Sequence, residues 1–288
     1  NPVEWFAPKT LAELQQCLQQ KTEKTAFLAG GTDFLVTERQ ALAKWQGIID
    51  LSHLAALQEI HFSEAEVWLG AMMTYQQISE EPCLGQEFPA LVEAAGLVGS
   101  QQIRNRGTIG GGLVNASPAG DLLPVWFALA AEVELLSASG EKSRLPISEF
   151  LLGARAVALQ PKQCVLGIIL PRHPRQSCHF AKLGVRSQVA IAQISAAATI
   201  SCQEDDTGGR TIEAIRFYVG AIAPKPVPWV EEAVSYQGQP WAWLQEEDTK
   251  HALVAYYQRW ILAHTPAEYD RDYKAQAVKA VVFEVLDS

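Results

Sequence analysis

The N-terminal part of the chain alternates between helical and strand-like patterns of apolar residues. The sequence Thr10-Leu11-Ala12-Glu13 is a capping box, in which the Thr hydroxyl and the Glu carboxylate each accept a hydrogen bond from a free amide at a helix start. The apolar residues of the helix that follows share one face: Leu11, Leu14 and Leu18. Apolar runs at 25–28 and 47–51 are typical of short buried strands. We therefore predict a small α/β subdomain over residues 1–55.

The pattern changes to a mixture of longer helices and strands over the next part of the chain. Alternating or continuous apolar runs predict strands at 59–62, 67–71, 133–135 and 165–170. Helical patterns fall at 74–78, 89–98 and 122–130. Together they predict a second subdomain over residues 56–171, and the proline-containing stretch 171–175 is a plausible linker.

The last third of the chain combines long strands with helices. The runs 189–201 and 211–221 flank a polar glycine turn, which is a hairpin signal. Three prolines then break regular structure: Pro224, Pro226 and Pro228. Helical patterns follow at 229–236, 249–264 and 272–285. This order predicts a separate α+β domain over residues 177–288, a sheet with helices to one side.

Composition and charge exclude several classes of function. The net charge of −9 argues against a nucleic-acid partner, because phosphate backbones attract Lys and Arg. No apolar run approaches the roughly 20 residues of a transmembrane helix, and no signal peptide is visible. The five cysteines are scattered without a Cys-x-x-Cys pair, so we expect reduced thiols in a cytoplasmic protein. Neither an iron–sulfur cluster nor a structural metal is expected on this chain, and the histidines form no ligand spacing.

Two glycine-containing stretches carry the candidate chemistry. The first glycine motif follows the predicted strand at 25–28: Leu28, Ala29, Gly30, Gly31, Thr32 and Asp33. The second glycine motif lies later in the chain: Thr108, Ile109, Gly110, Gly111 and Gly112. Glycine lets a backbone approach a ligand closely, and consecutive amides in a turn bind phosphate. Each motif alone is also compatible with a plain structural turn, and neither fits the dinucleotide or P-loop patterns. Together they predict a diphosphate held from two sides.

The two motifs and their neighbours resemble the FAD-binding subunit of the molybdenum hydroxylases, the xanthine dehydrogenase and carbon monoxide dehydrogenase family. Further blocks of the resemblance occur in order: Gln102-Ile103-Arg104-Asn105, Asn115-Ala116-Ser117-Pro118, Asp121-Leu122-Leu123-Pro124 and Lys182-Leu183-Gly184-Val185-Arg186. The resemblance implies an α+β fold, namely a two-subdomain FAD-binding domain of the vanillyl-alcohol-oxidase (PCMH) type followed by a C-terminal α+β domain. It also implies that both glycine motifs bind FAD. The family usually has Asn at the position of Gly112, so one side-chain hydrogen bond is in doubt here.

Several charged residues have both a functional and a structural interpretation. The resemblance implies that Asp121 contacts the flavin and that Lys182 lies at the flavin, where a cation stabilises negative charge on the reduced ring. Asp121 could instead cap the helix that follows it, and Lys182 could be a solvated residue on a strand. Asp33 could likewise bond its own turn backbone. Arg104 and Arg106 could neutralise a diphosphate or form surface pairs.

The resemblance implies that the chain is an electron-transfer subunit of a heteromeric oxidoreductase. FAD would be on this chain, the molybdenum cofactor on a large partner subunit and 2Fe–2S clusters on a small one, with an acceptor such as NAD receiving the electrons. No catalytic residue is expected on this chain. One alternative is a self-sufficient FAD-dependent oxidase or reductase, but no acid–base constellation is visible. The other is a flavin-free structural subunit, which the intact glycines of both motifs disfavour.

Overall fold

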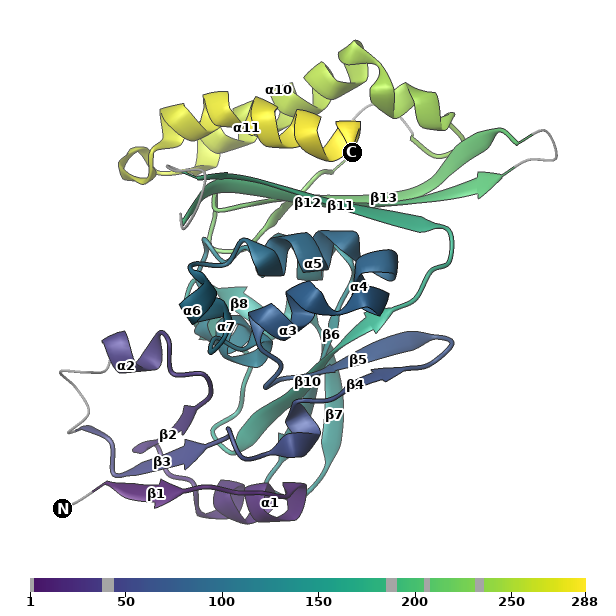
Figure 1. Cartoon of the computed structure of the whole chain (residues 1–288). Helices are drawn as coiled ribbons and strands as arrows, with labels where there is room; N and C mark the ends of the chain where they lie inside the picture. The colour runs from purple at the N-terminus through teal and green to yellow at the C-terminus, as the bar shows by residue number, and fades with distance from the viewer. Residues whose placement is uncertain (1–2, 38–43, 185–190, 205–207, 231–235) are drawn as a thin grey trace. The chain divides into compact units, whose positions relative to one another are not determined.

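The computed structural model describes residues 3–37, 44–184, 191–204, 208–230 and 236–288 (Figure 1). Its contacts divide the chain into two compact units, each built from separate stretches of sequence. Unit 1 comprises Asn1–Ile78, Gln101–Ala116 and Ala130–Arg172, and unit 2 comprises Ser79–Ser100, Ser117–Leu129 and His173–Ser288. One boundary falls within the stretch 171–175. The division into segments 1–55, 56–171 and 177–288 stays a prediction.

Unit 1 begins with a small parallel sheet and one helix. Its strands follow the order β1 (Glu4–Phe6), β3 (Gly47–Asp50) and β2 (Thr25–Leu28). Helix α1 (Leu11–Gln20) starts as the capping box predicts, because the Thr10 hydroxyl accepts from the Glu13 amide at 3.2 Å. The Glu13 carboxylate accepts from the Lys9 amide at 2.7 Å, one residue before the expected partner. The predicted helix and strands are therefore confirmed.

A five-stranded antiparallel sheet forms the larger part of unit 1. Its order is β4 (Ile60–Phe62), β5 (Glu66–Gly70), β10 (Gln163–Pro171), β6 (Glu132–Ser137) and β7 (Lys142–Pro146). One buried cluster joins Leu14 and Leu18 of α1 to Ile49 of β3 and to Leu136 and Leu166 of the larger sheet. Both sheets of unit 1 therefore share a hydrophobic core, whose burial supplies most of the stabilisation.

Short elements complete unit 1 around these sheets. They are η2 (Ala55–Leu57), α2 (Phe34–Thr37), α6 (Gln101–Arg104), α7 (Ile109–Asn115), α9 (Ile147–Phe150) and the hairpin β8 (Leu151–Gly153) with β9 (Ala156–Val157). Helix α3 (Tyr75–Glu80) is divided between the two units. The second glycine motif thus lies at the start of a helix, where the sequence predicted a loop.

Unit 2 is a four-stranded antiparallel sheet with helices on both faces. Its strands are β11 (Gln176–Gly184), β12 (Ala192–Glu204), β13 (Arg210–Gly220) and β14 (Val227–Pro228), in that order. Helices α4 (Pro82–Glu87) and α5 (Pro89–Gly96) lie on one side, and α10 (Glu247–His264) and α11 (Arg271–Asp287) on the other (Figure 1). Helix α8 (Leu122–Ala128) contacts α5, β12 and β13 on the same side as α5. Two short 3₁₀ turns, η3 (Trp241–Gln245) and η4 (Ala267–Tyr269), adjoin the last helices. The helices α10 and α11 of residues 177–288 thus lie on one side of the sheet, as the sequence predicted. The other face is covered by helices from residues 82–128, which the sequence placed outside this domain.

Strand β12 shows why the sheet takes helices on both faces. Its alternate residues Ile194, Ala196, Ala198 and Ile200 join the core that contains α10 and α11. The intervening Thr199 points the other way, and its buried hydroxyl donates to the carbonyl of Ala128 at 2.8 Å, at the end of α8. Because side chains alternate across a strand, small residues on one face and aliphatic residues on the other bury both faces.

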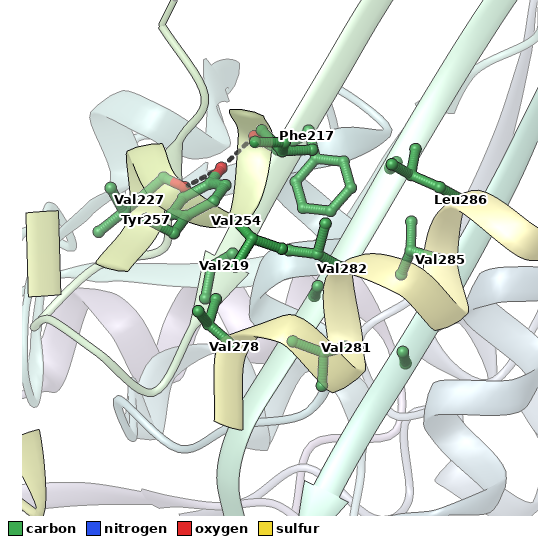
Figure 2. Close-up of a cluster of buried hydrophobic side chains, with 14 of the residues drawn as sticks. Phe217, Val219, Val227, Val254, Tyr257, Val278, Val281, Val282, Val285 and Leu286 are labelled. Atoms are coloured by element: carbon green, nitrogen blue, oxygen red, sulfur yellow. Dashed lines mark hydrogen bonds between the residues drawn. The ribbon is translucent and has the colours of Figure 1, made fainter. Parts of the chain in front are cut away.

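The core beneath α10 and α11 contains the large side chain of Tyr257 (Figure 2). This side chain is fully buried, and its hydroxyl lies 3.2 Å from the carbonyl oxygens of Phe217 and of Val227. Valines of α11 belong to the same buried cluster: Val278, Val281, Val282 and Val285. The buried Tyr257 hydroxyl is thus satisfied, as a buried polar group requires.

Two predictions for the last third of the chain have different outcomes. The expected break at the prolines is corrected in part, because Val227 and Pro228 pair with β13 as an edge strand. A proline is tolerated there because an edge strand does not need every amide in the ladder. The helix expected at 229–236 falls largely on 231–235, outside the described residues. None of the helices in the described part of the chain is long and apolar enough to cross a membrane.

Candidate functional site

The first glycine motif is a half-buried loop that follows β2 directly. Gly31 has φ +76°, a left-handed conformation that side chains with a Cβ rarely adopt. In the described part of the chain, the backbone N–H groups of Gly30, Gly31 and Thr32 donate no hydrogen bond. Three successive free amides around a left-handed residue form an anion-binding concavity. The loop therefore has the chemistry of a phosphate site.

The second glycine motif forms the first turn of α7. The Thr108 hydroxyl caps this helix by accepting from the Gly111 amide at 3.2 Å, and the Gly112 amide donates to the Thr108 carbonyl at 2.9 Å. The Ile109 and Gly110 amides donate to carbonyls of the preceding loop, those of Met73 and Ala71. The expected row of free amides is therefore not found in this motif, because the amides of residues 109–112 are bonded within the protein.

The glycines of the second motif serve close packing. A Cβ on Gly110 would lie 2.6 Å from the Ala71 Cβ and 2.7 Å from the Ala71 carbonyl oxygen. A Cβ on Gly112 would overlap the hydroxyl of Tyr75. At Gly110 the clash is with backbone, so only glycine fits there, whereas at Gly112 a side chain would have to displace the end of Tyr75. The Tyr75 hydroxyl thus occupies the space that a side chain at position 112 would take. The resembled family usually has Asn at this position.

The structure brings the two motifs side by side in unit 1. A Cβ on Gly30 would overlap the carbonyl oxygen of Arg106, directly before the second motif. At Gly111, a Cβ would come within 3.3 Å of the Ala29 Cβ. The glycines thus let two backbones approach one another, and the second motif supports the loop that carries the free amides.

Asp121 and Lys182 form a buried ion pair in unit 2. Lys182 Nζ lies 2.7 Å from Asp121 Oδ2 and donates to the carbonyl of Leu97 at 3.0 Å. The exposed fractions of the two side chains are only 7% for Lys182 and 8% for Asp121. Burial raises the pKa of Asp121 to about 6, because loss of hydration outweighs the attraction of the Lys182 ammonium. The other carboxylate oxygen, Oδ1, has no hydrogen-bond partner among the described residues.

Both structural interpretations of this pair are wrong. Asp121 precedes α8, but its side chain makes no capping hydrogen bond. Lys182 lies on β11 with its ammonium group buried, and it is not a solvated strand residue. A carboxylate with one oxygen unsatisfied and a buried cation beside it is a polar site built at some cost in stability. Such sites are often functional.

Of the remaining sequence candidates, Arg104 and Asp33 are half-buried and Arg106 is exposed, and two residues emerge that sequence reasoning missed. Arg104 donates to the side-chain carbonyl of Gln76 at 3.3 Å, and the Arg106 side chain is exposed. Asp33 pairs with Arg155, whose Nη1 lies 3.5 Å from the Asp33 Oδ2. Neither Arg155 nor Tyr75 stands in a motif that could have identified it, because both contacts depend on the fold.

Sequence comparison identifies the family. The family described as "FAD binding domain in molybdopterin dehydrogenase" matches residues 1–173. The chain is 34% identical over 242 residues to the nicotinate dehydrogenase FAD-subunit of Eubacterium barkeri, an alignment that covers 82% of this chain and 80% of the relative. It is 26% identical over 288 residues to the carbon monoxide dehydrogenase medium chain of Hydrogenophaga pseudoflava, covering 99% and 96%. The chain therefore belongs to the FAD-binding family of the molybdopterin dehydrogenases.

Solved structures show the same fold. A carbon monoxide dehydrogenase structure from Hydrogenophaga pseudoflava superposes with a TM-score of 0.82 at 23% identity, covering 100% of this chain and 96% of that one. Quinoline 2-oxidoreductase from Pseudomonas putida 86 gives 0.82 at 22% identity, covering 99% and 96%. The α+β fold implied by the resemblance is thus confirmed. The chain is an FAD-binding component of an oxidoreductase.

The residues present fit FAD. The free amides of Gly30, Gly31 and Thr32 suit a diphosphate, and Asp121 Oδ1 is a buried acceptor of the kind that a flavin ring N–H satisfies. In the described part of the chain, no group of three or more His, Cys, Asp or Glu side chains could hold a metal ion.

Proposed function

We propose that the chain holds FAD and carries electrons within a multi-subunit molybdenum hydroxylase. In this proposal the large partner subunit carries the molybdenum cofactor, the small one carries 2Fe–2S clusters, and an acceptor such as NAD receives the electrons. Relatives named as FAD-subunit and medium chain of dehydrogenases support this assignment. When bound, FAD supplies the redox chemistry, while the protein supplies binding and electrostatics. The free cysteines support a cytoplasmic location for the complex.

The observation that carries the proposal is the row of free amides in the first glycine motif. Gly30, Gly31 and Thr32 would bind the diphosphate through their N–H groups. The rest of this motif and the second motif would keep that loop in place: Leu28, Ala29, Asp33, Thr108, Ile109, Gly110, Gly111 and Gly112. Backbone donors suit a chain of net charge −9, because the overall field disfavours an anion and only local donors favour it.

Asp121 and Lys182 are the proposed flavin contacts. Asp121 would accept from the flavin through Oδ1, while its Oδ2 keeps the Lys182 ammonium in place at 2.7 Å. Lys182 would present a positive charge that favours extra negative charge on the cofactor. No nucleophile or acid–base pair is required for this role, because the substrate would be converted on a partner subunit.

The full chain, purified alone, provides the first test. We expect a flavin spectrum, or its appearance on adding FAD, and release of FAD on denaturation. A protein that neither contains nor binds FAD would be a flavin-free structural subunit. We also expect no turnover of a heterocycle and aldehyde panel by the isolated chain. Robust turnover without molybdenum or iron in the sample would instead show a self-sufficient flavin oxidase.

Coexpression with the genes of partner subunits tests the route of the electrons. We expect a larger complex that contains molybdenum and iron–sulfur absorbance, with substrate-dependent bleaching of the flavin band. Reduced nicotinamide should also bleach the flavin of the isolated chain if NAD is the acceptor. If substrate bleaches the flavin but reduced nicotinamide does not, the result would favour an acceptor other than NAD.

A further inference from the structure

Arg155 contacts both segments that carry the glycine motifs. It lies in the turn between β8 and β9, within unit 1. Its backbone amide donates to the carbonyl of Ala116 at 2.9 Å, directly after α7. Its Nη1 lies 3.4 Å from the carbonyl oxygen of Asn115, the last residue of α7, and also donates to the Asn115 side chain. The same nitrogen lies 3.5 Å from Oδ2 of Asp33, the last residue of the first glycine motif.

The backbone at Arg155 favours a different residue. Its φ is +56°, in the left-handed region where a Cβ clashes with the backbone and glycine is relaxed. Arginine is therefore not explained by the local conformation of the turn. What it adds over glycine is a cation that reaches Asp33 and Asn115.

The charge of Asp33 makes this cation relevant to an anionic ligand. Asp33 follows directly on Gly30, Gly31 and Thr32, whose amides are free to bind a phosphate. An uncompensated carboxylate beside that site would repel a diphosphate. The Arg155 guanidinium offsets part of this charge and also ties the loop to the end of α7.

We propose that Arg155 is a positioning residue for FAD, which neutralises Asp33 and holds the first glycine motif against the helix that the second motif begins. This inference rests on the proposed function, because it takes the free amides as the diphosphate site. It adds a residue outside both motifs and gives it an electrostatic role.

The test uses the full chain and three variants: Arg155→Gly, Asp33→Asn and the double variant. FAD is removed, and its Kd is measured by titration of the flavin fluorescence. Arg155→Gly should weaken FAD binding about tenfold at low salt, as expected for the loss of one cation near Asp33 and a diphosphate. Asp33→Asn alone should change Kd by less than about threefold. The double variant should bind nearly as well as the wild type, because it no longer carries the repelling carboxylate.

The thermal unfolding midpoint of each FAD-free variant separates positioning from folding. Arg155→Gly should leave this midpoint unchanged or raise it, because glycine relaxes the left-handed backbone. Arg155→Lys is the conservative control: it keeps the charge, and it should retain tighter FAD binding than Arg155→Gly. If Arg155→Gly fails to fold, Arg155→Gln replaces it in the same series.

The outcomes distinguish a role of Arg155 in FAD binding from failure of the proposed function itself. If Arg155→Gly binds FAD with the same Kd as the wild type, the role of Arg155 is overturned and the proposed function stays intact. Weakened binding that Asp33→Asn does not rescue would overturn the neutralisation of Asp33 and leave Arg155 only its contacts with α7. Failure of the wild type itself to bind FAD would remove the proposed function and this inference together.

Discussion

The ammonium of Lys182 lies 2.7 Å from the carboxylate of Asp121, although 61 residues separate the two in the sequence. Both side chains are almost fully buried, and Asp121 Oδ1 has no partner among the described residues. Replacing such a pair by apolar residues is often neutral or stabilising, so packing alone does not explain why it is present. In the proposed function, FAD would use the charge and the free oxygen of this pair.

The raised pKa of Asp121 predicts a pH dependence of stability. Between its unfolded value of 3.8 and its folded value of about 6, the folded state binds more protons than the unfolded state. The free energy of unfolding of the FAD-free protein should therefore fall as pH rises through this window, by up to about 3 kcal/mol. Urea unfolding at pH 4, 5, 6 and 7 measures the slope. Asp121→Asn should lose it, and parallel pH profiles for the two proteins would contradict the assignment.

Removing the cation and removing the anion of the Asp121–Lys182 pair should move the midpoint potential of the flavin in opposite directions. Lys182→Met removes the cation, so it should lower the midpoint potential of the bound FAD by at least about 30 mV, equivalent to roughly 1.4 kcal/mol for a two-electron couple. Asp121→Asn leaves the Lys182 charge unpaired and should raise the potential. Spectroelectrochemical titration of the three proteins measures both shifts. Equal potentials in all three would show that the pair does not act on the flavin.

The local sequence patterns predicted the helices and strands of the chain well, but they predicted few of its polar contacts. Strand β2 spans Thr25–Leu28 as expected, because a short apolar run bounded by polar residues has few other solutions. The pairing of β12 with β13 also followed from a polar glycine turn between two long apolar runs. Such signals are local, and the resemblance to a family then supplied the two motifs and the cofactor.

Contacts that depend on the fold could not be predicted in the same way. Three glycines in the first turn of α7 disfavour a helix by about 1 kcal/mol each relative to alanine, so the sequence indicates a loop. The helix forms because Gly110 and Gly112 let it pack against Ala71 and Tyr75, which lie elsewhere in the sequence. Arg155 shows the same limit, because nothing local to its turn indicates a partner such as Asp33.

A methyl group at Gly30 should separate the two glycine motifs. Its Cβ would overlap the Arg106 carbonyl, so Gly30→Ala should lower the free energy of unfolding by about 1–3 kcal/mol and weaken FAD binding as well. Gly85→Ala is the matched control, because nothing lies within 4 Å of its Cβ position in α4. That variant should keep its stability or gain up to about 1 kcal/mol. Equal stability of the two variants would show that the motifs do not need the close approach.

The fit between Gly112 and Tyr75 predicts a rescue. Gly112→Ala places a Cβ on the Tyr75 hydroxyl, so it should destabilise the protein by about 1–3 kcal/mol. Tyr75→Phe removes the hydroxyl, after which the nearest remaining ring atom lies 3.2 Å from the new Cβ.

The double variant should therefore recover part of the loss. We expect a coupling energy of about 1–2 kcal/mol between the two sites in a double-mutant cycle of urea unfolding. Gly112→Asn, the residue usual in the family, should be tolerated only with Tyr75→Ala, which frees space for the longer side chain. Additive effects at the two sites would mean that Tyr75 moves away freely, and that Gly112 does not depend on it.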